Sequence, residues 1–442
     1  MKKLIGLGIV AITVACIPYI TGIMTEKQYL ADMQEMQNSP TLHSVPFDLK
    51  INVSYQRGWF SSTAVNAITL TLADQKPVTV KVNNHISHGP VLFNGPKRFG
   101  LAAIETQVPL SEGQQAEIAK IWKSDEKPVQ IHSHIGFSGD STIEASIAGF
   151  TLENIDGKPS DAVTFEPFEM TVAFADNLSR FNANFDWNGL QVNAKDLNIF
   201  VGKVTARSEK YRLLEDLWLG DDEVKFGVLK FKLDKLSTDP LVESPSSVTL
   251  EELAVVAHSE VDNNNLVRGD TTLIVKNAMA ENLPVASDIK LTVALENMPA
   301  QALQSVSRKL SDYQNQVIQS ANPEQLPDFS EYQEDLEQIL AANPVLKIPA
   351  AQANTQQGRV EADLEVSINE ANTSMLQNPI LLLGVVEVSA NVNIPAKLIA
   401  ETPLAEQIPI LVSQGYIIDD HGQLKSAIQF QQGELTVNGK TM

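Results

Sequence analysis

The sequence is poor in the residue types that disulfide frameworks, thiolate metal sites and nucleic-acid surfaces require. A single cysteine, Cys16, occurs among 442 residues, which excludes an intramolecular disulfide and a cysteine-based zinc cluster. The 33 Lys and Arg residues are outnumbered by 54 Asp and Glu residues, giving a formal net charge of −21. We therefore expect no binding to nucleic acid. Phosphate-cradling glycine loops are absent too, and no motif calls for a cofactor or a metal.

The first 24 residues predict a membrane segment. Lys2 and Lys3 precede an uncharged run over residues 4–24, which as a helix would be about as long as a hydrocarbon core is thick. No comparable basic cluster follows the run, so the N-terminus is expected in the cytoplasm and the bulk of the chain across the membrane. In a bacterium this is a single-pass inner-membrane protein with a periplasmic body.

Three interpretations of this segment remain open. An uncleaved signal anchor is preferred, because the apolar stretch exceeds a typical signal core. Lipidation at Cys16 after Val14-Ala15 and cleavage of a secretory signal near Ala15 are the alternatives. Residues 25–40 then predict a helical stalk, with Thr25 as its cap and Tyr29 and Met33 on one face.

Most of the remaining chain alternates between apolar and polar residues. In residues 47–55 every second residue is apolar, a pattern typical of half-buried antiparallel strands. The same pattern recurs over residues 68–72, 78–82, 129–137, 143–147, 163–174, 181–185, 190–200, 248–256, 271–275, 289–294, 385–392 and 424–430.

Helices are predicted in few places. Residues 299–320 and 329–339 carry apolar residues at steps of three and four, separated by Asn322-Pro323, which indicates an αα-hairpin. A further helix with a serine cap is expected over residues 111–123 and a weaker one over 396–412, and linkers are expected over 237–247 and 343–358. The fold class is thus α+β and mainly antiparallel β: a long twisted sheet or two related β modules, residues 41–240 and 241–442, with the αα-hairpin inserted.

Three short motifs resemble catalytic or metal-binding sites, but each is explained more simply by a structural role. Gly139-Asp140-Ser141 is similar to the nucleophile block of GDS-type hydrolases, but Asp420-His421 late in the chain has the wrong spacing for the base. A turn is the preferred interpretation. His132 and His134 share one face of a strand and could bind a metal with a carboxylate, yet the apolar residues on the other face, Val129, Ile131, Ile135 and Phe137, indicate that both histidines face solvent. The acidic run at residues 221–223 is interpreted as a solvated face.

Several segments together resemble the YdgA-like family of bacterial envelope proteins. They are the N-terminal hydrophobic segment, residues 55–62, 88–90, 135–141 and 433–440. The resemblance implies an inner-membrane-anchored periplasmic protein of unknown biochemical function and provides no catalytic residue. The family-motif residues, which we expect to be structural, are Tyr55, Arg57, Gly58, Phe60, Ser61, His88, Gly89, Pro90, Gly136, Phe137, Ser138, Gly139, Asp140, Ser141, Gly433, Asn438 and Gly439.

The expected function is non-enzymatic binding or scaffolding in the cell envelope. One form is a carrier that holds lipid or another hydrophobic ligand on a curved β-sheet, motivated by the long alternating strands. The alternative is a homo-oligomeric scaffold, for example a homodimer, and the third hypothesis is an envelope hydrolase that uses Ser141.

Overall fold

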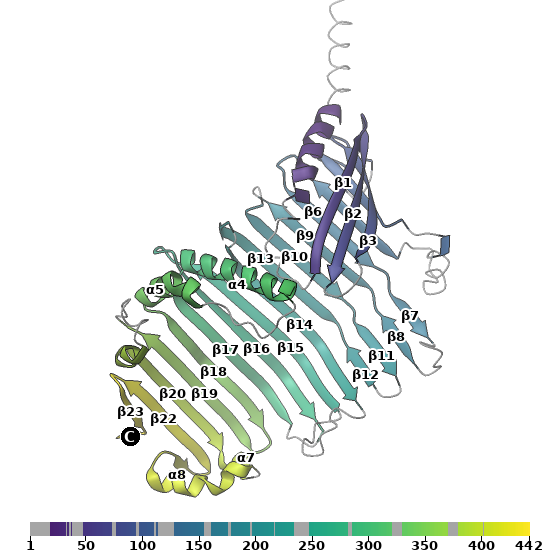
Figure 1. Ribbon diagram of the computed structural model, residues 1–442. Helices are drawn as coiled ribbons and strands as arrows, with labels where there is room; N and C mark the ends of the chain where they lie inside the picture. The colour runs from purple at the N-terminus through teal and green to yellow at the C-terminus, as the bar shows by residue number, and fades with distance from the viewer. Residues whose placement is uncertain are drawn as a thin grey trace, which may run out of the picture.

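The chain folds into one large, open, antiparallel β-sheet (Figure 1). The structure is a computed structural model, and it describes residues 18–31, 33–34, 37, 47–72, 77–93, 97–109, 112–113, 128–153, 161–175, 178–194, 197–215, 217–233, 247–281, 285–320, 329–369, 379–400 and 402–442. Within these residues the sheet has 24 strands. The prediction of a mainly antiparallel β protein is confirmed, and of its two forms the single long sheet is the one observed.

The strands follow one another as a meander. Most strands pair with their predecessor, and the paired order along the sheet is β1 to β6, then β9, β10, β13 to β20, and β22 to β24. The first twelve strands are β1 (Phe47–Arg57), β2 (Ser61–Leu72), β3 (Val78–His88), β4 (Ala102–Gln107), β5 (Val129–Ile135), β6 (Ser141–Ile147), β7 (Phe150–Glu153), β8 (Ala162–Phe165), β9 (Phe168–Ala175), β10 (Arg180–Trp187), β11 (Leu190–Ala194) and β12 (Leu197–Val201).

The second half contains the longest strands. They are β13 (Val204–Leu214), β14 (Leu217–Leu233), β15 (Ser247–Val261), β16 (Leu266–Ala280), β17 (Ala286–Pro299), β18 (Val345–Thr355), β19 (Gly358–Ile368), β20 (Val386–Pro395), β21 (Ile418–Asp420), β22 (Gln423–Gln431), β23 (Glu434–Val437) and β24 (Lys440–Thr441). The predicted domain boundary at residue 240 lies outside the described residues, and β14 pairs with β15 on either side of it.

Several strands are interrupted at the same level of the sheet. The pairs β6/β7, β8/β9, β10/β11 and β12/β13 are each collinear, with a break of two residues between them. Pro167 has no N–H for the ladder, and Gly189 adopts φ 126°, so each forces a break. The uninterrupted strand predicted over residues 163–174 is therefore wrong at Pro167. The one predicted over residues 190–200 is wrong because this stretch forms two antiparallel strands, β11 and β12.

Short helices lie along the ends of the strands. A helix over residues 18–31 packs on the first strands, α4 (Ala300–Ser320) and α5 (Gln333–Ala341) contact β13, β14 and β17, and α7 (Ala396–Ile399) contacts β20. The remaining elements are α8 (Ile408–Gln414) and the 3₁₀ helices η2 (Phe329–Tyr332), η3 (Pro379–Gly384) and η4 (Pro403–Glu406). Figure 1 shows α4 and α5 together at one end of the central strands and α7 and α8 at the C-terminal part of the sheet.

The predicted αα-hairpin corresponds to α4 and α5. Lys309 of α4 holds them together, because its Nζ lies 2.7 Å from Asp335 Oδ2 and donates to the Glu331 carbonyl oxygen at 2.7 Å. The helix predicted over residues 396–412 is divided into α7, η4 and α8, with Pro403 and Pro409 each at the beginning of a new helical segment. Most of the helix predicted over residues 111–123 lies outside the described residues.

The predicted linker over residues 343–358 is wrong. Residues 345–355 form β18, which pairs with β17 and β19. Pro349 misled the prediction, since proline is rare inside strands, but here it lies at the register shift between Ile348 and Ala351, where a missing ladder hydrogen bond is tolerated. The linker predicted over residues 237–247 lies outside the described residues except for its last residue.

The N-terminal prediction is only partly covered by the described residues. Residues 1–17 of the expected membrane segment lie outside them, whereas residues 18–24 are described as part of the helix over residues 18–31. Thr25 is therefore not a cap: it lies inside the helix, and its hydroxyl donates to the Thr21 carbonyl oxygen at 2.8 Å. Among the described helices, none has the length and apolarity needed to span a membrane.

Candidate functional site

The family-motif residues of the first three strands meet beneath the N-terminal helix. Ser62 of β2 and His88 of β3 form a buried pair, with Ser62 Oγ 2.7 Å from His88 Nε2. His88 Nδ1 lies 3.3 Å from the Trp59 carbonyl oxygen. A carbonyl can only accept, so we assign the ring proton to Nδ1, and Nε2 then accepts a hydrogen bond from the Ser62 hydroxyl.

The N-terminal helix covers this pair directly. Gly22 packs against the imidazole so closely that a Cβ at this position would lie 2.5 Å from the His88 ring. The Thr21 hydroxyl, one residue earlier, donates to the Gly89 carbonyl oxygen at 2.9 Å. Ser62 and His88 are only 2% and 1% exposed. The helix is thus docked on the sheet by contacts between residues of the predicted membrane segment, Thr21 and Gly22, and the motif at His88-Gly89.

A second set of buried polar groups holds the other end of the helix. The Tyr29 hydroxyl accepts hydrogen bonds from Asn66 Nδ2 at 2.6 Å and from Asn84 Nδ2 at 2.9 Å. Thr106 of β4 fixes Asn84, because its hydroxyl donates to Asn84 Oδ1 at 2.7 Å. These groups surround an apolar cluster that includes Ile86 and Ile104, so the helix and four strands share one small core.

Burial controls the protonation of this cluster. It lowers the pKa of His88, although the Trp59 carbonyl acts in the opposite direction, and the neutral imidazole is therefore the favoured form. Burial also raises the pKa of Tyr29, while the hydrogen bond from Asn66 partly offsets this effect. The cluster therefore carries no charge near neutral pH.

A serine paired with histidine is the arrangement of an activated nucleophile, but this pair faces no substrate site. A general base must lie within about 2.6–3.2 Å of the proton that it accepts, and Ser62 and His88 satisfy that distance. The helix, however, leaves almost none of either residue accessible. We conclude that the pair acts here in packing, and we find no sequence signal that singled out Ser62 in advance.

The outer surface of the helix holds the remaining residues of the first motif. Arg57 lies over the Tyr19 ring at 5.1 Å and pairs with Glu26 at 2.5 Å. Tyr19 in turn packs against Trp59, with the ring centroids 5.0 Å apart. The Arg57 guanidinium therefore contacts both an aromatic ring and a carboxylate of the N-terminal helix.

Glycine is required where the second motif turns. Gly89 precedes Pro90 through a cis peptide bond and donates its N–H to the Leu101 carbonyl oxygen at 2.7 Å. A Cβ on Gly89 would lie 1.7 Å from the Gly100 carbonyl oxygen, so no other residue fits without a backbone shift. This turn lies beside the third motif, because Leu101 N–H bonds to the carbonyl oxygen of Ile135.

The third motif forms the hairpin between β5 and β6. Gly136 N–H donates to the Asp140 carbonyl oxygen at 2.8 Å, Ser138 Oγ lies 2.8 Å from Asp140 Oδ2, and Gly139 has φ 89°. Phe137 of this hairpin is exposed. Ser141 is the first residue of β6 and pairs with Ile135 and Phe174, whereas His132 and His134 alternate with Ile135 and lie on the opposite face. The hydrolase prediction thus has no histidine from β5 beside Ser141.

The fourth motif lies at the other end of the sheet. Gly433 has φ 78° and Gly439 has φ 73° in the two turns that flank β23. Asn438, also at positive φ, accepts from the Ala427 N–H and donates to the Gly415 carbonyl oxygen. The chain brings three motifs together beneath the helix and leaves the fourth as the closing hairpin.

The larger feature of the molecule is an apolar face that extends across the whole sheet. Strand register places side chains of successive strands on the same side, because paired residues point the same way. One such row, from β5 to β20, consists of Ile131, Ala145, Met170, Phe185, Ala206, Val224, Val255, Leu273, Leu291, Ala351, Ala362 and Val392. We call this side of the sheet the apolar face.

The opposite side is polar. On this side, paired residues include His132, Glu144, Thr171, Asn184, Arg207, Glu223, Thr272, Gln352, Glu361 and Asn393, with Val256 between Glu223 and Thr272. The sheet is therefore largely amphipathic from β5 to β20, as the period-two alternation of the sequence predicts.

Aromatic side chains gather on the apolar face between β7 and β14. Successive ring contacts of 5.0–5.4 Å join Phe150 to Phe165, Phe165 to Trp187, Phe168 to Phe185 and Phe174 to Phe181. The Trp218 ring of β14 follows at 6.5 Å from Phe181. These rings are half-exposed, so they form an accessible apolar surface.

The helices cover this face only in part. Among the described residues, 18 apolar residues are buried, while Leu291, Val293 and Leu295 on the apolar face of β17 are exposed. A hollow of about 400 Å³ lies between Val293 and Leu295 on one side and Leu303 of α4 on the other. The face therefore offers unoccupied apolar surface beside α4.

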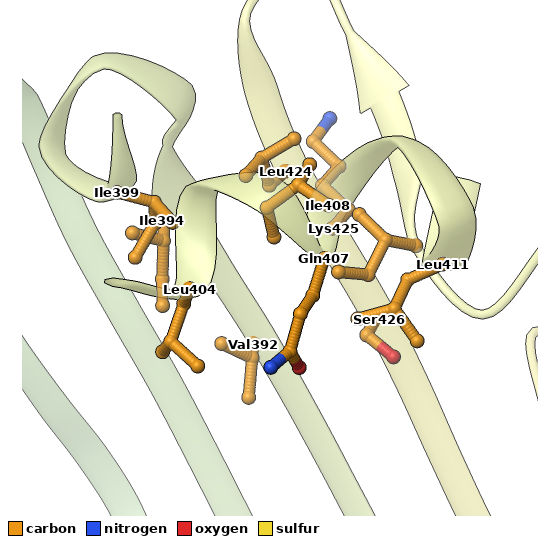
Figure 2. Close-up of a pocket in the computed structure, with 11 residues that line it drawn as sticks. Val392, Ile394, Ile399, Leu404, Gln407, Ile408, Leu411, Leu424, Lys425 and Ser426 are labelled. Carbon is orange, nitrogen blue, oxygen red and sulfur yellow. The ribbon is translucent and has the colours of Figure 1, made fainter. Parts of the chain in front are cut away.

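A second, smaller hollow lies at the C-terminal part of the same face. Its volume is about 220 Å³, and Val392 and Ile394 of β20 form one wall while Leu404 and Leu411 form another (Figure 2). Its lining is almost entirely apolar. Among the described residues, no group of three or more His, Cys, Asp or Glu side chains is arranged to hold a metal ion.

Comparison with known proteins identifies relatives over the full length. A family model described as "Bacterial protein of unknown function (DUF945)" matches residues 1–442. Protein YdgA of Escherichia coli (strain K12) is 22% identical over 501 aligned residues, covering 100% of this chain and 95% of YdgA. No solved structure matches the chain.

Proposed function

We propose that this chain, which belongs to the DUF945 family of bacterial proteins of unknown function, is a non-enzymatic protein that holds acyl chains on the apolar face of its sheet. The observation that carries the proposal is the continuity of that face, which includes exposed leucines and half-exposed aromatic rings. Exposed apolar area of this extent is characteristic of a binding surface. Acyl chains suit it because contact with them needs neither hydrogen bonds nor fixed geometry.

The dimensions of the face also suit an extended hydrocarbon. Twelve strands from β6 to β22, counted along the paired order and within the described residues, span about 50 Å at roughly 4.8 Å per strand. This exceeds the thickness of a bilayer core, about 30 Å. One or more acyl chains could therefore lie across the strands between the helix over residues 18–31 and α8.

The cellular setting is part of the proposal. An anchor in the bacterial inner membrane would have to lie mainly before residue 18, because residues 18–24 dock on the sheet. Lys2 and Lys3 would then lie in the cytoplasm and the sheet in the periplasm. A phosphatase reporter that is active only in the periplasm, fused after Met442, tests this orientation. An inactive fusion that accumulates to normal levels would contradict it.

Site-specific photocrosslinking in living cells tests the lipid proposal on the full chain. Leu291 of the apolar face and Ile274 of the polar face are 37% and 38% exposed and lie on neighbouring strands, so they form a matched pair. A photoreactive phenylalanine analogue replaces each in turn. We expect lipid adducts by mass spectrometry at position 291 and none at position 274.

The same experiment separates the alternatives. Protein adducts at position 291 would favour the scaffold hypothesis, and equal lipid adducts at both positions would reveal only contact with the membrane. Either result contradicts the carrier. The hydrolase hypothesis is tested separately: serine-directed probe labelling that persists unchanged in Ser141→Ala would eliminate it.

One observation favours the scaffold as a second candidate. Among the described strands, β1 pairs only with β2, so the other edge of this 11-residue strand is open to another chain. A homodimer formed along β1 would continue the sheet and its apolar face. Sedimentation of the purified full chain tests it, and a monomer at every concentration would contradict it.

A further inference from the structure

The apolar face carries a small charged cluster on β13 and β14. Asp222 lies at its centre, accepting a hydrogen bond from the Ser208 hydroxyl at 2.6 Å and pairing with Lys210 Nζ at 2.5 Å. Arg212 follows two residues later on the same face. Charged groups on an otherwise apolar surface lose hydration energy, so their presence requires an interaction that compensates for it.

Arg212 is held in place but has capacity for another partner. Its guanidinium lies over the Trp218 ring at 5.1 Å, and its Nη2 donates to the Leu178 carbonyl oxygen at 2.6 Å. Its Nε is buried and has no hydrogen-bond partner in the described structure. A buried donor without a partner is costly, and an anionic oxygen would satisfy it.

The cluster has a net positive charge within a strongly acidic chain. Lys210 and Arg212 contribute two positive charges and Asp222 one negative charge, whereas the whole chain has a net charge of −21. The Lys210 side chain is 17% exposed, so it is partly shielded from water and from screening ions. The local excess therefore favours an anion at this point of the face.

The surroundings match an amphiphile, with a polar group beside apolar surface on both sides. Lys210 pairs with Phe181 on β10, from which the ring contacts lead on to Phe174. On the other side it pairs with Gly220 of β14, which pairs in turn with Ser259. Ser259 lines the hollow of about 400 Å³ beneath α4, so the cluster separates two stretches of apolar surface.

We propose that Lys210 and Arg212 bind the anionic head group of an amphiphile, a carboxylate or a phosphate, whose acyl chain lies on the aromatic rings of β9 and β10. This inference rests on the proposed function and specifies the class of ligand. The guanidinium provides paired donors for carboxylate or phosphate oxygens, and Lys210 provides a second positive charge. Asp222 and Ser208 position Lys210.

A photoreactive fatty acid and its methyl ester test the role of the charge. Both carry a diazirine on the acyl chain and are titrated against the full chain in amphipol, and the half-saturating concentration for adducts on residues 168–187 is measured by mass spectrometry. We expect the acid to label at lower concentration than the ester. In the double variant Lys210→Met, Arg212→Gln this preference should fall about tenfold, which corresponds to about 1.4 kcal/mol.

The matched control lies on the opposite face of the same two strands. Arg207 of β13 pairs with Glu223, and Lys225 of β14 also contacts Glu223. The double variant Arg207→Gln, Lys225→Met removes the same two types of charge and should leave the preference for the acid unchanged. Labelling by the ester should stay constant in all variants, which shows that the sheet remains folded.

The other outcomes distinguish failure of the head-group site from failure of the proposed function. Equal labelling by acid and ester in the wild-type chain, or an unchanged preference in Lys210→Met, Arg212→Gln, overturns the head-group site while the proposed function stands. Absence of saturable labelling by either probe on any variant overturns the proposed function itself. Displacement of the acid by millimolar inorganic phosphate, with the ester retained, would assign the cluster to a free anion and overturn the amphiphile.

Discussion

Docking of the N-terminal helix should depend strongly on one hydroxyl group. Tyr29→Phe removes the oxygen that lies 2.6 Å from Asn66 Nδ2 and 2.9 Å from Asn84 Nδ2, both in buried residues. An unsatisfied buried polar group costs about 1–3 kcal/mol. Because Asn66 retains a weak contact with Met33 Sδ at 3.6 Å, we expect the two losses together to reach about 2–4 kcal/mol.

Amide hydrogen exchange measures this loss directly. If residues 18–31 exchange through undocking of the helix, a loss of about 2–4 kcal/mol accelerates their exchange roughly 30- to 1,000-fold, because about 1.4 kcal/mol corresponds to a factor of ten. Strands distant from the helix, such as β16, should keep their exchange rates. The effect on the whole sheet is small, since the helix contacts only its first strands.

Tyr19→Phe provides the matched control on the same helix. The Tyr19 hydroxyl is exposed and lies 3.4 Å from Arg57 Nη2, a long contact, so its removal should cost less than about 0.5 kcal/mol. Exchange in Tyr29→Phe within threefold of the wild type would refute the role that we assign to the Asn66 and Asn84 amides. Equal acceleration in both variants would show that the helix depends on its outer surface instead.

Three further predictions test the buried histidine, the glycine turn and the ion pair between α4 and α5. Burial lowers the pKa of His88, so below about pH 6.5 the unfolded chain binds more protons than the folded chain. Helix docking should therefore weaken as the pH falls through this range. The difference in amide protection of the helix between about pH 5 and pH 7.5 should be smaller in His88→Gln than in the wild type. Gly89→Ala places a Cβ against the Gly100 carbonyl oxygen and should destabilise the first strands by about 3 kcal/mol or more in urea unfolding, whereas Gly384→Ala, with open space around it, should not. Lys309→Met leaves the buried Asp335 carboxylate without its partner and should loosen α5 by about 1–3 kcal/mol by hydrogen exchange, with Asp335→Asn restoring part of it.

Much of the sheet could be predicted from local alternation. The alternation over residues 47–55 depends only on which face of the strand is buried. It predicts β1 (Phe47–Arg57) to within two residues of its end. Strand β14 was missed because Gly220 and the acidic residues 221–223 interrupt the apolar rhythm. In the structure, Asp222 lies on the apolar face with Ser208 and Lys210, and its side chain is 41% exposed.

The helix-docking cluster could not be predicted in the same way. Tyr29 and Asn66 are 37 residues apart, and Ser62 and His88 are 26 apart. Their contacts depend on the register of three strands and on the position of a helix, neither of which the sequence pattern specifies. The head-group cluster is similar, since Lys210 and Asp222 become neighbours only once β13 and β14 pair.

The amphipathic sheet poses a physical problem that its helices do not solve alone. Each exposed apolar side chain forgoes about 25 cal/mol for every Å² left in water, and the apolar face leaves aromatic and branched side chains accessible on many strands. A compact protein would fold a second layer over such a face, whereas here the described helices cover mainly the strand ends. A bound acyl chain would cover the apolar face in place of a second layer of protein, and it would need no defined sequence or strand register. The protein is therefore expected to be more stable with a lipid than without one, and delipidation that raises its thermal stability would contradict this account.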